Sequence, residues 1–112
     1  MMSVFEEQTR NDLNKKHLEI EVQTRSTLFW KGLMYALDCI KYNGLHGNAW
    51  SIGYQFDPDG YTMRTNGKYI ECYKGNREDK NYKRVKVEDG ACYYTNLLDW
   101  YLKDAVEPLF ND

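Results

Sequence analysis

The middle of the chain contains short runs in which apolar and polar residues alternate, and these runs are separated by turn-forming residues. Asp57-Pro58-Asp59-Gly60 is typical of a β-turn, because Pro presets φ and Gly accepts the positive φ that leads back into a sheet. Asn66-Gly67 predicts a two-residue type I′ hairpin turn. Residues 49–87 are therefore predicted to form a four-stranded antiparallel β-meander.

Alternation along the predicted strands assigns their side chains to two faces of the sheet, since successive residues of a strand point in opposite directions. The apolar set is expected to face the helices and comprises Met63, Ile70, Cys72, Val85 and Val87. The opposite set is expected to point outward and comprises Thr62, Arg64, Tyr69, Glu71, Tyr73, Tyr82, Arg84 and Lys86.

Two amphipathic helices are predicted on either side of the meander. The first covers about 26–43, with Ser26 or Thr27 as its cap and Asn43-Gly44 at its end. Its buried face is predicted to contain Phe29, Trp30, Leu33, Met34, Leu37 and Ile40. The second covers about 92–107 and is expected to stop at Pro108; its buried stripe contains Tyr94, Leu97, Leu98, Tyr101, Leu102, Ala105 and Val106.

The first 25 residues offer few apolar side chains to a core. Ser3-Val4-Phe5-Glu6 has the spacing of a capping box, which predicts a helix start near Val4. Residues 17–25 alternate in the manner of a strand, yet the same residues could continue one long helix, and both interpretations stay open. We expect residues 1–25 to form a helical arm or an extra strand, and we expect self-association as a homodimer, or partner docking, through this segment.

The chain has 112 residues, of which 42% are hydrophobic and 29% charged, as in an ordinary globular domain. This length supports one core, so we predict a single α+β domain over 1–112 with its helices packed on one face of the meander. The apolar run Leu33–Leu37 is far shorter than the roughly 20 residues of a membrane span, and the N-terminus lacks signal-peptide character. We therefore expect a cytoplasmic protein without membrane contact.

The residues that could carry catalysis are sparse. Cys39, Cys72 and Cys92 are widely spaced and contain no Cys-x-x-Cys pair, and His17 and His46 lie outside metal-ligand spacing. No Gly-rich phosphate loop occurs in a strand-loop-helix context. These patterns predict reduced thiols, no metal and no cofactor.

Two enzymatic arrangements can still be considered. Cys92 at a helix start could act with His46 in a small hydrolase, but a small buried Cys is the commoner role. Asp57 and Asp59 could act as an acid-base pair, but the β-turn already explains both residues. We therefore predict that the chain is not an enzyme.

The outward face of the sheet carries the main functional prediction, which is that these residues bind a partner: Arg64, Tyr69, Tyr73, Tyr82, Arg84 and Lys86. Tyr and Arg are enriched at the energetic centres of protein interfaces. The same residues could stack bases and bind phosphate, although the sequence pI of about 5.7 is low for a nucleic-acid binder. An ordinary solvated face with cross-strand pairs is the third possibility.

Charge and aromatic content favour partner binding over catalysis. Residues 64–87 carry 8 Lys/Arg against 3 Asp/Glu, and residues 88–112 carry 1 against 6, within a net charge of −2. The chain also contains 10 Tyr and 3 Trp, more than a core of this size needs. We predict a small binding protein that acts stoichiometrically on a protein, such as a phage-type inhibitor of a host defence system or a toxin-immunity protein. The alternative is a nucleic-acid or nucleotide binder.

Overall fold

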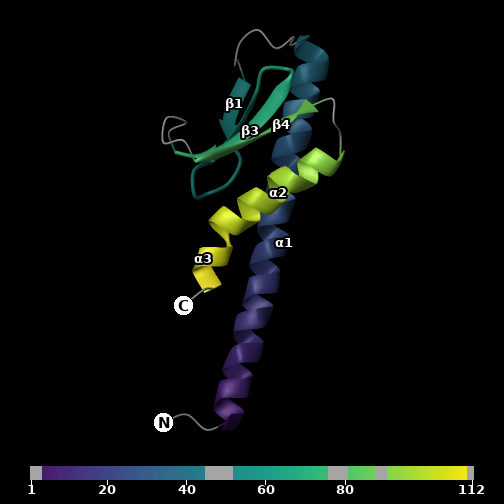
Figure 1. Cartoon of the computed structure of the whole chain (residues 1–112). Helices are drawn as coiled ribbons and strands as arrows, with labels where there is room; N and C mark the ends of the chain where they lie inside the picture. Colours follow the sequence, from purple (N-terminus) through teal and green to yellow (C-terminus); the bar gives the residue numbers. More distant parts are fainter. Residues whose placement is uncertain (1–3, 45–51, 76–80, 88–90, 111–112) are drawn as a thin grey trace.

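The computed structural model describes residues 4–44, 52–75, 81–87 and 91–110, and it has the predicted α+β fold. A long N-terminal helix is followed by a four-stranded antiparallel sheet and a C-terminal helix (Figure 1). The elements are α1 (Val4–Asn43), β1 (Ile52–Gln55), β2 (Tyr61–Thr65), β3 (Tyr69–Lys74), β4 (Tyr82–Lys86), α2 (Ala91–Ala105) and α3 (Glu107–Phe110).

The sheet is a meander with strand order β1-β2-β3-β4, as the turn signals predict. Both long helices pack against it, α1 mainly on β2 and α2 mainly on β4, and the two helices also contact each other. The core lies between these layers, because alternation sends the apolar side chains of each strand toward the helices. It includes Phe29, Leu33, Met63, Ile70, Cys72, Val85, Leu97 and Tyr101.

Residues 17–25 are helical, so α1 is one continuous helix and no strand forms there. Leu18, Val22 and Phe29 lie on one side of this helix at helical spacing, and Arg25 occupies the remaining position on that side. The predicted helix start at Ser26 or Thr27 is therefore wrong. The Thr27 hydroxyl instead donates within the helix to the carbonyl of Gln23, over 2.9 Å.

Trp30 and Met34 were expected in the core, but their side chains are 39% and 58% exposed. The buried apolar side chains of α1 in this region include Phe29, Leu33 and Ala36. Each residue advances about 100° around a helix, so Trp30 and Met34 are rotated away from the buried positions that directly precede them. The prediction merged two separate faces of α1 into one.

The second hairpin turn differs from the predicted type I′ turn at Asn66-Gly67. Thr65 pairs with Ile70, and Asn66 N donates to Tyr69 O, so Gly67 and Lys68 occupy the centre of the turn. The Asn66 carboxamide stabilises it by accepting the N–H groups of Lys68 and Tyr69, at 3.0 and 2.9 Å. Cross-strand partners are thereby displaced by two residues, an even shift that leaves every side chain on its predicted face.

The other chain reversals follow the sequence more closely. Gly44 and Gly60 have positive φ angles of 61° and 96°, as expected for a helix end and for the turn after β1. The C-terminal helix ends at Ala105 rather than near residue 107, and α3 follows at once. Pro108 lies in the first turn of α3, where its missing N–H costs little, so it does not stop the helical path as predicted.

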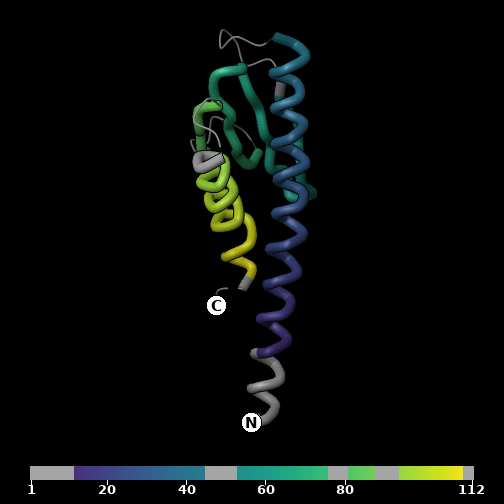
Figure 2. The backbone as a smooth tube through the Cα atoms, turned by 90° about the vertical axis from the view of Figure 1, so that its right-hand side faces the viewer, coloured from purple at the N-terminus to yellow at the C-terminus, as the bar shows by residue number. Residues whose placement is uncertain are grey.

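The molecule is elongated, with principal dimensions of 60 × 26 × 21 Å. The figures show the reason: toward its N-terminus, α1 projects beyond the sheet and α2 (Figure 1 and Figure 2). Within the described residues, no helix combines the length and apolar character that a membrane span requires.

Candidate binding surface

The outward side of the sheet carries a row of three charged residues from three neighbouring strands. Arg64 on β2 is the cross-strand partner of Glu71 on β3, and Glu71 is the partner of Arg84 on β4. Residues directly opposite in an antiparallel pair have their side chains on the same face, close enough to interact. The carboxylate therefore lies between two guanidinium groups.

Glu71 is completely buried although it points away from the helices, because the two arginines cover it. Arg64 Nε donates to Glu71 Oε2, and Arg84 Nε donates to Glu71 Oε1, each over 2.8 Å. Arg84 Nη2 also donates to Oε1. The side chains of Arg64 and Arg84 remain 23% and 37% exposed, respectively. The Glu71 carboxylate is therefore shielded from solvent, while the outer surfaces of both arginines stay accessible.

Tyrosine rings surround this charged row and pack against it. Arg64 lies over the ring of Tyr73, 5.6 Å from its centroid. Arg84 contacts two rings, with its guanidinium carbon 5.1 Å from the centroid of Tyr69 and 5.9 Å from that of Tyr82. Cation–π contacts of this kind favour flat stacking of a guanidinium on an aromatic face. The arginines are thus held from the side as well as from below.

We use the name outer sheet face for the surface formed by Arg64, Tyr69, Glu71, Tyr73, Tyr82, Arg84 and Lys86. The register brings all six residues that the sequence suggested for partner binding onto this one surface. Lys86, opposite Tyr69, is exposed and extends the surface along β4. The residue that the sequence did not single out is Glu71, which joins the two arginines.

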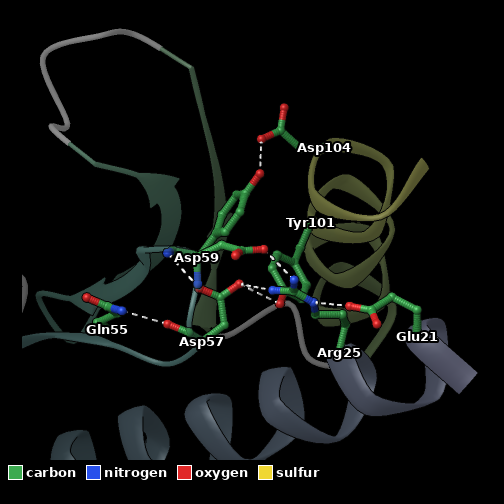
Figure 3. Close-up of polar contacts among 8 residues, drawn as sticks. Glu21, Arg25, Gln55, Asp57, Asp59, Tyr101 and Asp104 are labelled. Carbon is green, nitrogen blue, oxygen red and sulfur yellow. Dashed lines mark hydrogen bonds and ion pairs between the residues drawn. The ribbon is translucent and has the colours of Figure 1, made fainter. Parts of the chain in front are cut away.

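A second polar cluster lies inside the molecule, where the turn after β1 meets both long helices (Figure 3). Asp57 Oδ2 accepts hydrogen bonds from Arg25 Nη1 of α1 and from the Tyr101 hydroxyl of α2, both at 2.8 Å. Its Oδ1 accepts the backbone N–H groups of Asp59 and Tyr61, at 3.1 and 2.8 Å. All the oxygens of this buried carboxylate are therefore occupied by neighbours.

Arg25 is equally well satisfied. Its Nε donates to Glu21 Oε1 over 2.8 Å, and its Nη2 donates to the carboxylate of Asp59. Arg25 thereby holds both aspartates of the turn in ion pairs. The cluster joins α1, the β1–β2 turn and α2.

The adjacent tyrosine hydroxyls are also engaged. The Tyr61 hydroxyl donates to Asp104 of α2, which also accepts from Asn81 at 3.1 Å. Burial raises the pKa values of Tyr61 and Tyr101 well above their ordinary range, and the hydrogen bonds from Tyr61 to Asp104 and from Tyr101 to Asp57 add to this effect. Both phenols stay protonated near neutral pH, so they act as donors that connect the helices to the sheet.

Among the described residues, the other chemical candidates are two cysteines, in the core and at its edge. Cys39 and Cys72 are buried free thiols, and burial raises the pKa of Cys72 well above its usual value. The side chain of Cys92 and all of His46 lie outside the described residues. Across ranges 4–44, 52–75, 81–87 and 91–110, no three His, Cys, Asp or Glu side chains gather as metal ligands would.

Comparison with known proteins assigns this arrangement to no group. No family model, curated protein or solved structure matches the chain. Function is therefore inferred from the geometry of the outer sheet face.

Proposed function

We propose that this chain is a non-enzymatic binding protein that captures a protein partner stoichiometrically on the outer sheet face. The observation that carries the proposal is the buried Glu71 carboxylate between Arg64 and Arg84. Arginine and tyrosine dominate the energetic centres of protein interfaces, and here both residue types lie together on a sheet.

The ion pairs support binding because they fix the arginines before a partner arrives. A flexible surface arginine loses rotamer freedom when it is immobilised at an interface, which weakens association. Arg64 and Arg84 are already restrained by Glu71 below and by Tyr73 and Tyr69 beside them. A partner therefore meets an ordered surface and loses less binding energy to side-chain ordering.

The same contacts favour a protein over a nucleic acid. Arginines bind phosphate through their guanidinium N–H groups. Here the Nε–H group of each arginine already donates to Glu71, so fewer N–H groups remain for phosphate. Glu71 also cancels one of the three positive charges that Arg64, Arg84 and Lys86 bring to the outer sheet face. Nucleic-acid or nucleotide binding is the second candidate function, favoured by tyrosine rings beside arginines.

Within the class of binding proteins, we propose an inhibitor, such as a phage-type antagonist of a host defence system or an immunity protein that neutralises a toxin. A rigid Arg-Tyr surface supports this assignment, because an inhibitor needs tight binding and no chemistry. We place its action in the cytoplasm, where the thiols of Cys39 and Cys72 would stay reduced.

The proposal can be tested by affinity capture from native host cells, with and without nuclease, read by mass spectrometry. We expect a protein that is enriched in equimolar amount, survives nuclease and is lost when Arg84→Glu is used as bait. The matched control is Lys103→Glu, the same charge reversal at an exposed position of α2. Recovery of nucleic acid with a steep salt dependence would support the second candidate instead.

Glu71→Gln separates the two candidates further. Removing the negative charge adds one net positive charge to the outer sheet face and loosens both arginines. Phosphate binding should then strengthen, with a steeper salt slope, whereas binding of a protein partner should weaken because the surface is less ordered.

A further inference from the structure

The side of α1 that faces away from the sheet carries a long stripe of exposed apolar side chains. Five large residues contribute, each between 39% and 76% exposed: Leu13, Ile20, Trp30, Met34 and Tyr42. Tyr35 borders the stripe and packs edge-on against Tyr54 of β1. Soluble monomers seldom present so many large apolar side chains along one element. The stripe is therefore a candidate interface.

The stripe and the core occupy opposite sides of the helix. At about 100° per residue, Leu13, Ile20 and Met34 lie within about 60° of one another, whereas Phe29 and Leu33 lie on the far side. In Figure 2, α2 and most of the sheet lie on one side of α1. A shallow pocket of about 560 Å³ opens on the stripe, between Thr27, Trp30, Lys31, Met34, Tyr35 and Asp38.

The charges beside the stripe follow an order that suits a second copy of this chain. Asp12 and Lys16 lie near its beginning, and Asp38 and Lys41 lie near its end. Among the described residues, no ion pair engages any of these four side chains. All four are exposed, so each is accessible to a partner.

An antiparallel arrangement of two α1 helices pairs these charges when its two-fold axis passes beside Thr27. Ile20 and Met34 each lie seven residues from Thr27, and Lys16 and Asp38 each lie eleven residues from it. Ile20 then meets Met34 of the other copy, and Lys16 meets its Asp38. Asp12 lies opposite the C-terminal end of the other copy's α1, close to Lys41 of that copy.

A parallel arrangement would instead place Lys16 against Lys16 and Asp38 against Asp38, so that like charges oppose each other. Like charges that face each other across an interface cost binding free energy and select against the wrong orientation. The two-fold arrangement also makes each surface its own complement, as an isologous dimer requires. It covers the projecting arm, which the sheet and α2 leave bare.

We infer that the chain forms an antiparallel homodimer in which the exposed stripe of α1 packs against that of a second copy, with Thr27 near the two-fold axis. This interface is separate from the outer sheet face, so both surfaces of each copy stay open to their own partners. Its test is therefore independent of the proposed function.

The test is sedimentation equilibrium of the purified full-length chain over a range of concentrations. The wild type should be a dimer, and Lys16→Asp and Asp38→Lys should each raise the dimer dissociation constant about tenfold or more, because each reversal turns two attractive pairs into repulsive ones. Combining both reversals should restore the wild-type constant within about threefold. Lys15→Asp is the matched control, since it is an adjacent exposed position of the same helix turned away from the stripe.

Far-UV circular dichroism should show that each variant keeps its helix content. A wild type that stays monomeric at high concentration would overturn the inference and leave the stripe to a different partner. A dimer that tolerates both single reversals, or that the double reversal fails to restore, would also overturn it, because the interface would then lie elsewhere or have another register.

Discussion

Arg25 and Asp57 lie 32 residues apart in the sequence, yet Arg25 Nη1 donates to Asp57 Oδ2 across 2.8 Å in the interior of the molecule. This ion pair fixes the turn after β1 against the middle of α1. Because Tyr101 donates to the same oxygen, α2 is attached at the same point. Three elements thus depend on one buried carboxylate.

Asp57→Ala should therefore lower the free energy of unfolding by about 3 kcal/mol or more, because it removes one partner of a buried pair. It also leaves the N–H group of Tyr61 without its acceptor. Urea denaturation measures the loss. Asp59→Ala is the control, since that side chain is 44% exposed and its removal should cost much less. Equal losses in the two variants would contradict the structural role of Asp57.

The buried phenols predict a loss of stability at alkaline pH. The pKa values of Tyr54, Tyr61 and Tyr101 are raised, mainly by burial, so the folded chain keeps these protons when the unfolded chain has begun to lose them. Their contribution is complete below about pH 10, the ordinary tyrosine value, and falls above it by up to about 1.4 kcal/mol per pH unit for each tyrosine.

Unfolding measured from pH 8 to pH 11 should show this decline. Tyr61→Phe has no proton to lose at that position, so its stability should fall less steeply above pH 10. A wild type with constant stability up to pH 11, or a Tyr61→Phe variant with the wild-type slope, would argue against the assigned burial.

Gly32 should resist a substitution that normally stabilises helices. Alanine in the middle of a helix is favoured over glycine by about 1 kcal/mol. Here a Cβ on Gly32 would lie 2.9 Å from Cβ of Phe56, the residue that follows β1. Gly32→Ala should therefore destabilise the protein in thermal unfolding, whereas Thr24→Ala, at an exposed position of the same helix, should not. A higher melting temperature for Gly32→Ala would disprove the close approach.

Glu71→Gln should destabilise the sheet by about 2 kcal/mol or more, because a buried acceptor of charged hydrogen bonds becomes neutral. Glu19→Gln makes the same chemical change at an exposed position of α1 and should alter stability by less than about 0.5 kcal/mol. Chemical denaturation of both variants decides the point. If the two changes prove equally mild, Glu71 does not organise the outer sheet face.

Local patterns were enough to predict much of the fold. The alternation of β2, β3 and β4 and the turn glycines produce the meander, and the stripe on α2 predicts its buried side correctly. These features depend on neighbours in the sequence, which a period of two or of 3.6 residues records directly. Residues 17–25 fit both periods because Ile20 completes a strand-like alternation, although it is 54% exposed in α1. The helical spacing has a gap at Arg25, whose burial depends on Asp57, distant in the sequence.

The candidate surface could be predicted in part for the same reason. Alternation places Arg64, Tyr73 and Arg84 on one face of the sheet for any hairpin register that differs from the predicted one by an even number of residues. The opposition of Arg64 to Glu71 depends on the turn centred at Gly67 and Lys68, whereas a turn at Asn66-Gly67 would have set Arg64 opposite Tyr69. The burial of Glu71 follows from that long-range register, so no local pattern could reveal it.

Calorimetric titration of the captured partner with wild type, Tyr73→Ala, Arg84→Glu and the control Lys103→Glu measures how much the outer sheet face contributes to binding. We predict equimolar binding that weakens by about 2 kcal/mol or more, roughly thirtyfold, in the first two variants, as for residues at an energetic centre. Thermal unfolding should show that both variants remain folded, and the control should bind like the wild type. Unchanged affinity in both Tyr73→Ala and Arg84→Glu would show that the partner does not bind the outer sheet face.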